Sequence, residues 1–147
     1  MSLRVRLSED MKLAMKSKDK FRLSVIRMVR AAIQNVEIDK QIELSDDEVL
    51  VVLNREVKQR KDSLQEFKNA NRDDLASKTE QEIAILMEYM PQQLTDDEID
   101  ALVQEAVTET GASSKKDIGN VMKYLITKIQ GRADGKLVNQ IVQKYLQ

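Results

Sequence analysis

The chain has 147 residues, a net charge of −1, no histidine, no cysteine and a single proline. The absence of histidine and cysteine excludes thiol catalysis, the commonest general base and nearly every zinc or iron site. Because one proline and four glycines leave little to interrupt helices, the composition predicts an all-α protein.

The sequence also bears on location. The longest apolar run, residues 49–53, falls far short of the ~20 residues that a membrane span needs. Residues 1–6 contain no apolar core of a signal peptide. We therefore expect a soluble, cytoplasmic protein with no membrane partner, and the lack of cysteine fits a reducing compartment.

The near-zero net charge hides a pattern along the chain. Residues 1–36 carry nine basic and three acidic residues, residues 37–111 carry eight and twenty, and residues 112–147 carry seven and two. Such an asymmetry can mark an anionic partner, or the basic ends can simply pair with the acidic middle.

Four helices are predicted in the first 90 residues, at about 2–17, 19–38, 46–69 and 73–90. The second and fourth have Asp19 and Asp73 as suitable N-caps, and the third opens with a capping box of Ser45 and Glu48. The helical spacing predicts that the first helix buries one face, which consists of Leu3, Leu7, Met11, Ala14 and Met15.

A polar strip follows the second helix. Arg27 and Arg30 lie three residues apart and are therefore neighbours on its surface, together with Lys20, Ser24 and Gln34. The strip is interpreted as a solvated surface or as a partner for the acidic middle of the chain.

Pro91 predicts the boundary between two subdomains. The residue before a proline is disfavoured in the α region, so the fourth helix should end near Met90. We expect an N-terminal helical subdomain at 1–90, a linker at 91–94 and a three-helix subdomain at 95–147.

The C-terminal subdomain begins with a second capping box, Thr95 with Glu98, and its first helix should stop at Gly111. Ser113 or Ser114 is suited to cap the next helix. Gly119 lies inside that helix against its propensity, and a close helix–helix approach is one explanation.

The last helix follows an unusual run at 131–142. Gly131 suits a left-handed residue at the end of the preceding helix, and Asp134 suits an N-cap. Helical spacing predicts burial of Leu137, Val138, Ile141, Val142 and Tyr145. The opposite face contains no acid and consists of Lys136, Asn139, Gln140, Gln143 and Lys144.

The run Gly-Arg-Ala-Asp-Gly-Lys-Leu-Val-Asn at 131–139 resembles the C-terminal signature of the GatB/YqeY group. Further stretches resemble the free-standing YqeY family, at 11–20, 23–28, 55–60, 89–94 and 110–114. The resemblance to GatB, the B subunit of the tRNA-dependent amidotransferase, covers roughly the last third of the chain. In that enzyme the module is a tail that touches tRNA and carries no chemistry.

No catalytic residue, metal ligand or cofactor-binding residue is expected. No Walker loop is present, and no strand precedes a glycine-rich turn. Ser113, Ser114 and Lys115 are similar to the catalytic set of amidases, but that set is dispersed along the A subunit, so we interpret the serines as helix caps. Catalysis by this chain alone is therefore not expected.

Anion binding is the chemistry that remains. Arg132 can fork a phosphate, Lys136 can add a point charge, and Asn139, Gln140 and Gln143 can donate hydrogen bonds to phosphate, sugar or base. Further candidates on the preceding helix are Lys115, Lys116 and Lys123. Alternatively, the glycines only make a tight turn, and Arg132 pairs with Asp134 or with the acidic middle.

The resemblance favours a non-catalytic RNA-binding module that contacts the backbone and shape of tRNA. One alternative is an accessory role in glutamine-dependent tRNA amidation, with the amidotransferase as partner. The other alternative is a protein–protein adaptor without RNA affinity, which would use an apolar or acidic patch.

Overall fold

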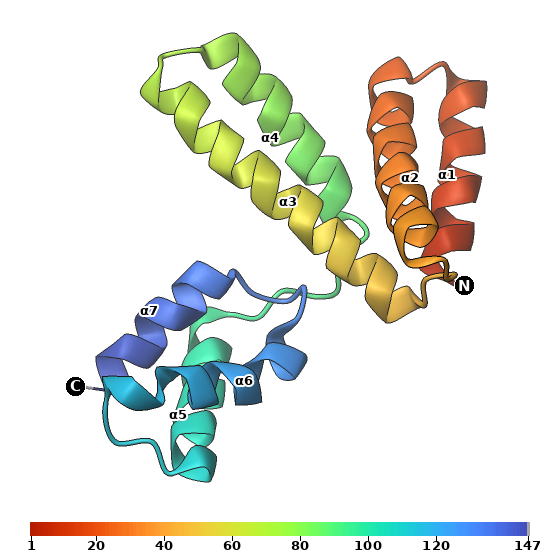
Figure 1. The fold of residues 1–147 in the computed structure, drawn as a ribbon. Helices are drawn as coiled ribbons and strands as arrows, with labels where there is room; N and C mark the ends of the chain where they lie inside the picture. The colour runs from red at the N-terminus through yellow and green to blue at the C-terminus, as the bar shows by residue number, and fades with distance from the viewer. Residues whose placement is uncertain (147) are drawn as a thin grey trace. The chain divides into compact units, whose positions relative to one another are not determined.

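The computed structural model describes residues 1–146 and contains seven α-helices, one short 3₁₀-helix and no β-strand in that range (Figure 1). The predicted all-α class is therefore confirmed. Residue 147, the last of the expected subdomain 95–147, lies outside the described residues. Across residues 1–146, no helix is both long and apolar enough to cross a bilayer.

The chain divides into two compact units, Met1–Met90 and Pro91–Gln147. Each unit has a hydrophobic core of its own.

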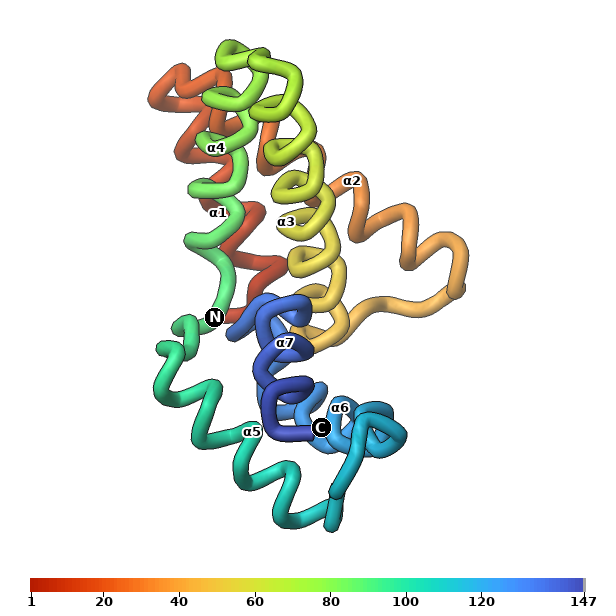
Figure 2. The backbone as a smooth tube through the Cα atoms, turned by 90° about the vertical axis from the view of Figure 1, so that its left-hand side faces the viewer, coloured from red at the N-terminus to blue at the C-terminus, as the bar shows by residue number. Residues whose placement is uncertain are grey.

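The N-terminal unit consists of two helical hairpins, α1 (Leu3–Ser17) with α2 (Lys20–Lys40) and α3 (Asp46–Asn69) with α4 (Asp73–Met87). Figure 2 shows α3 and α4 side by side along much of their length. The core forms where the apolar faces of these helices meet, and its most enclosed side chains include Leu7, Val25, Ile26, Val29, Val49, Leu53 and Leu86.

Capping side chains explain where several of these helices begin. Asp19 accepts a hydrogen bond from the Arg22 backbone N–H, and Ser45 and Glu48 form the predicted capping box. The fourth helix differs from the prediction, because its N-cap is Arg72, which makes no side-chain cap hydrogen bond. Asp73 is instead the first residue of α4, where a carboxylate complements the helix dipole.

The end of α4 also differs from the prediction. The helix stops at Met87, and Glu88, Tyr89 and Met90 bond back to Ile85, Leu86 and Met87 in tight turns. These turns bury Tyr89, which is only 4% exposed. The chain thus leaves the α-helix before the proline constrains it.

The C-terminal unit contains α5 (Asp96–Thr110), the 3₁₀-helix η1 (Lys115–Asp117), α6 (Ile118–Ile129) and α7 (Gly135–Tyr145). Its core gathers buried side chains from all three α-helices and from the residue after α7, namely Ile99, Val103, Ala106, Val121, Leu125, Ile129, Val138, Val142 and Leu146. Gly111 is the C-cap of α5, and Gly131 follows the C-cap of α6. Their φ values are 66° and 71°, which a residue without Cβ adopts at low cost.

Several predicted details of the helix faces are wrong. Met15, Leu137 and Tyr145 were expected to be buried but are 52%, 37% and 41% exposed. Gly119 has open space around it, since a Cβ added there would meet nothing within 4 Å. A close helix–helix approach therefore does not explain that glycine.

Candidate nucleic-acid interface

The turn before α7 is fixed by the segment at 92–94, within the same unit. The backbone N–H of Leu94 donates to the Arg132 carbonyl at 2.8 Å, and the Gln93 amide donates to the Gly131 carbonyl at 2.7 Å. The Arg132 Nε donates in turn to the Gln92 carbonyl at 3.1 Å. The last of these bonds holds the Arg132 side chain by one nitrogen, and its two terminal amino groups make no hydrogen bond to residues 1–146.

The Arg132 side chain contacts a backbone carbonyl and lies near one acidic residue. Its side-chain hydrogen bond goes to the Gln92 backbone, and Arg132 forms no ion pair with Asp134 among the described residues. Glu98 lies within its electrostatic reach. The pKa of Glu98 is lowered mainly by the Thr95 backbone N–H and hydroxyl, and to a smaller degree by the Arg132 charge.

The N-terminus of α7 already has an acceptor. Asp134 is the N-cap, as predicted, and its carboxylate accepts a hydrogen bond from the Lys136 backbone N–H at 2.9 Å. Gly135 is exposed, and the space around its Cα is open. The open approach is therefore present, but a negative charge already lies at this end of the helix.

A broad, shallow hollow lies further along α7. Its lining residues are Lys115 from η1 and Gln140, Gln143 and Lys144 from α7. Lys115 is positioned by the turn before it, where the Asp117 carboxylate accepts hydrogen bonds from the backbone N–H groups of Ser113 and Ser114. Ser114, one of the two serines expected to cap this helix, is the N-cap of η1 and forms a capping box with Asp117.

The hollow belongs to a longer polar face of α7. Lys136, Gln140 and Lys144 follow one another at intervals of four residues, so they lie along one side of the helix over roughly 12 Å. Asn139 is partly buried, and its side-chain oxygen accepts a hydrogen bond from the Gln143 amide at 2.6 Å. This face carries two cations and a row of amides with no acid among them.

The structure brings together only some of the predicted RNA-binding residues. Lys115 and Gln140 share the hollow, whereas Lys116 and Lys123 are exposed but do not line it. Arg132 lies before the first residue of α7, near the end opposite Lys144. Gln143, named as a hydrogen-bond donor from the sequence, also lines the hollow. Lys144 was missed as a site residue, although its helical spacing from Lys136 and Gln140 places it on the same face.

A second hollow lies between α7 and the start of α5. It is lined by Asp96, Asp97, Asp100, Leu137, Ile141, Lys144 and Tyr145. The Tyr145 hydroxyl donates to the Asp100 carboxylate at 2.7 Å and accepts from the Gln104 amide at 2.8 Å. The hydrogen bond to Asp100 is the main reason that the pKa of Tyr145 is raised. Leu137, Ile141 and Tyr145, which were expected in the core, thus line a partly apolar hollow together with three aspartates.

Comparison with known proteins gives one consistent result. The model of a family described as Yqey-like protein matches residues 4–146. A protein from Pyrenophora tritici-repentis, Altered inheritance of mitochondria protein 41, mitochondrial, is 33% identical over 142 residues, which cover 95% of this chain and 78% of the relative. The protein of the same name from Vanderwaltozyma polyspora is 28% identical over 148 residues, 95% of this chain and 80% of the relative.

A third protein of that name, from Lachancea thermotolerans, is 40% identical over 111 residues, which cover 74% of this chain and 59% of the relative. The mitochondrial names of these relatives contradict the cytoplasmic location predicted from the sequence. The prediction was wrong because the lack of cysteine and of an apolar leader argues only against secretion. Neither feature distinguishes a cytoplasmic from a mitochondrial protein. Mitochondrial transit peptides are amphipathic and have no such apolar leader.

Proposed function

Because the chain belongs to the Yqey-like protein family, we propose that its C-terminal unit is a non-catalytic module that binds RNA through the polar face of α7. The hollow formed by Lys115, Gln140, Gln143 and Lys144 carries this proposal. It joins a cation from η1 to one cation and two amides of α7, and no acidic side chain of the described residues lines it. The resemblance of residues 131–139 to the tRNA-contacting tail of the amidotransferase B subunit supports tRNA as the RNA.

The charge distribution within the unit favours this face for a polyanion. Three of the six acidic residues of α5 share the second hollow with Lys144, but none of the six lines the hollow beside Lys115, and residues 112–147 carry seven basic residues against two acidic ones. Lysine ammonium groups attract backbone phosphates, and glutamine amides donate to phosphate or sugar oxygens.

The chemistry of the face predicts recognition of backbone and shape. Tyr145 is the only aromatic residue of α7, and its hydroxyl is bonded to Asp100 beside the acidic hollow. Without an aromatic side chain to stack on unpaired bases, the face has little means of reading sequence. We therefore propose that folded tRNA and other structured RNA of similar shape bind with comparable affinity.

The direct test is fluorescence anisotropy of labelled tRNA across a salt series. The Lys115→Gln/Lys144→Gln variant should bind at least fivefold more weakly at low salt, and the log–log salt slope should fall by roughly 0.7–0.9 for each lysine–phosphate pair that the substitutions remove. The matched control is Lys116→Gln/Lys123→Gln, which removes the same charge from exposed positions outside the hollow. Equal weakening by the two variants would reject the hollow as the binding surface.

The acidic hollow supports a second candidate function, a protein–protein adaptor. Asp96, Asp97 and Asp100 beside the exposed side chains of Leu137 and Tyr145 suit a basic amphipathic helix of a partner protein. This function predicts no tRNA binding even at low salt. It also predicts that a basic amphipathic peptide binds to the wild type and does not bind to Leu137→Ser.

A further inference from the structure

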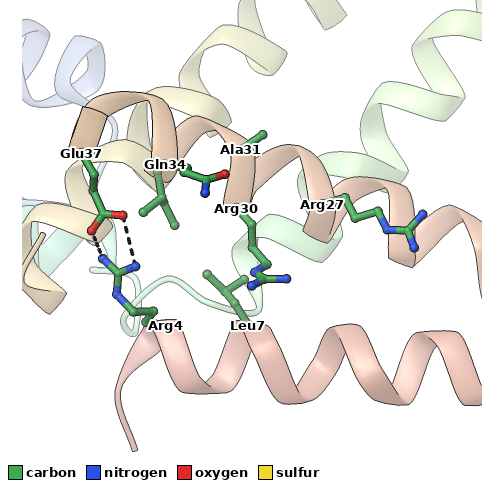
Figure 3. Close-up of a pocket in the computed structure, with 8 residues that line it drawn as sticks. Arg4, Leu7, Arg27, Arg30, Ala31, Gln34 and Glu37 are labelled. Atoms are coloured by element: carbon green, nitrogen blue, oxygen red, sulfur yellow. Dashed lines mark hydrogen bonds and ion pairs between the residues drawn. The ribbon is translucent and has the colours of Figure 1, made fainter. Parts of the chain in front are cut away.

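A separate hollow lies within the N-terminal unit, between α1 and α2 (Figure 3). Its volume is about 290 Å³, and its lining residues are Arg4, Leu7, Arg27, Arg30, Ala31, Ile33, Gln34 and Glu37. Leu7 and Ile33 are buried and form an apolar floor, with exposed fractions of 1% and 3%. Three arginines are thus among the residues that line a hollow near the lower end of the range for small-molecule pockets, roughly 300–1,000 Å³.

The spacing along α2 explains how the rim forms. Arg27, Arg30, Ala31 and Gln34 follow one another at intervals of three, one and three residues, so they share one side of the helix. All four are exposed, and Ala31 is the smallest among them. Figure 3 shows the Arg30 side chain extending from α2 toward Leu7 on α1.

One of the three arginines has a complete partner. Arg4 forms a two-pronged ion pair with Glu37, and the same carboxylate accepts a hydrogen bond from the Leu44 backbone N–H at 2.9 Å. The hydrogen bond from Arg4 is the main cause that lowers the pKa of Glu37, and the Leu44 N–H is the second. The Glu37 carboxylate is therefore committed to Arg4 and Leu44, and the pair adds no net charge to the hollow.

The other two arginines have no acidic partner among residues 1–146. The side-chain contact of Arg30 goes to the Met11 sulfur at 2.7 Å, and a thioether is a weak acceptor. Arg27 makes no hydrogen bond or ion pair in the same range. Two like charges three residues apart on a helix repel each other, and an anion placed between them removes that repulsion.

We propose that this hollow binds a small phosphate monoester, with Arg27 and Arg30 holding the phosphate group. A phosphate monoester carries a charge of about −1.5 to −2 at pH 7, which matches two guanidinium groups. Each guanidinium can present a planar fork of N–H donors to the phosphate oxygens. The Gln34 amide adds a donor at the next turn of α2, and the apolar floor accommodates the organic part of the ligand.

The size of the hollow and the charge separate this ligand from an RNA chain. An internal phosphodiester carries only one negative charge, and the small volume fits one compact molecule. The site lies in the other unit of the chain and does not depend on the RNA-binding proposal, so either can fail without the other.

The test is an NMR titration of the ¹⁵N-labelled full-length protein with glycerol 3-phosphate and with inorganic phosphate, at constant ionic strength. Backbone amides of α1 and α2 around residues 4–7 and 27–34 should shift in a saturable way. Arg27→Gln/Arg30→Gln should weaken binding at least tenfold, while Arg27→Lys/Arg30→Lys, which keeps both charges but removes the fork, should lie between that variant and the wild type.

The matched control is Arg55→Gln/Lys58→Gln on α3. It removes the same charge from exposed residues of the same unit, and its affinity should stay within twofold of the wild type. Equal weakening by the two double glutamine variants would overturn the site, as would shifts spread evenly over the protein. A third arm uses short RNA with a 5′-phosphate or a 5′-hydroxyl group. If only RNA shifts the α1 and α2 amides, the small-molecule assignment is wrong.

Discussion

The hydroxyl of Tyr89 donates a hydrogen bond to the carboxylate of Asp10, a residue 79 positions earlier in the chain. Two further contacts join the same parts of the N-terminal unit. The Arg6 guanidinium lies over the Tyr89 ring at 4.6 Å and also donates to the Glu88 carbonyl at 2.7 Å. These contacts attach the turns after α4 to α1, so the last residues of the N-terminal unit pack against its first helix.

The Tyr89→Phe variant should lose about 1 kcal/mol of unfolding free energy at pH 7, because the hydrogen bond to a charged acceptor is removed while the ring stays buried. The pKa of Tyr89 is raised by burial first and by the Asp10 hydrogen bond second. Its stabilising contribution is therefore complete below pH ~10, the pKa of an unfolded tyrosine, and is lost as pH rises above that value.

Urea unfolding at pH 7 and at several values from 9 to 11.5 checks both statements. The wild type should lose up to about 1.4 kcal/mol per pH unit more than Tyr89→Phe in the alkaline range, which corresponds to one proton. Parallel declines in the two proteins would show that Tyr89 does not titrate differently in the folded and unfolded states.

Arg60 joins α3 to α4 and should be important for stability. Its Nε donates to Glu82 at 2.9 Å and one terminal nitrogen to Glu56 at 2.7 Å, and its side chain is only 11% exposed. Arg60→Met leaves two largely buried carboxylates without their cation and should cost about 2 kcal/mol. Arg55→Met on the exposed side of α3 is the control and should change the unfolding free energy by less than about 0.5 kcal/mol.

Chemical denaturation of both variants gives the comparison. Adding Glu82→Gln to Arg60→Met should recover part of the loss, because it removes one of the uncompensated charges. If Arg60→Met lowers the unfolding free energy no more than Arg55→Met does, the ion pairs of Arg60 contribute nothing measurable to stability.

Substitution by alanine should change the unfolding free energy in opposite directions at two glycines of the C-terminal unit. Gly111 has a φ of 66° and open space around it, so Gly111→Ala should cost about 1–2 kcal/mol through backbone conformation alone. Gly119 lies in α6 with nothing near an added Cβ, and Gly119→Ala should stabilise by roughly 0.5 kcal/mol. Thermal unfolding of the two variants measures both effects, and a shift of the same sign in both would contradict this account.

Local signals predicted the helices well because the relevant interactions are local. The capping boxes of Ser45 and Thr95, the Asp134 cap and the positive φ of Gly131 all depend on residues within one or two turns. The end of α4 is different. Burial of Tyr89 against α1 decides it, and this contact with Asp10 has no trace in the neighbouring sequence.

The site was harder to predict, because periodicity identifies the faces of a helix but not their neighbours. Leu137, Ile141 and Tyr145 have the spacing of a core face, yet in the structure they line a hollow between α7 and the start of α5. Lys115 was grouped with Lys116 and Lys123 by charge alone. Only the folded C-terminal unit separates it from them, because Lys115 lines the same hollow as Gln140.

The Asp134 side chain connects helix stability to the proposed RNA binding, and two substitutions separate these roles. Asp134→Ser keeps a capping oxygen for the Lys136 N–H, so the unfolding free energy should change by less than about 0.5 kcal/mol. Asp134→Ala removes the cap and should cost about 1 kcal/mol.

Both substitutions remove the same negative charge next to Arg132 and Lys136. A phosphate about 7 Å from that carboxylate in water is repelled by roughly 0.6 kcal/mol, which corresponds to about a threefold change in affinity. We therefore expect both variants to bind tRNA about threefold more tightly at low salt, with the gain shrinking as salt screens the charge. If the tRNA affinity is unchanged in Asp134→Ser while the helix remains intact, phosphates do not approach this turn, and the RNA contact would be confined to the hollow beside Lys115.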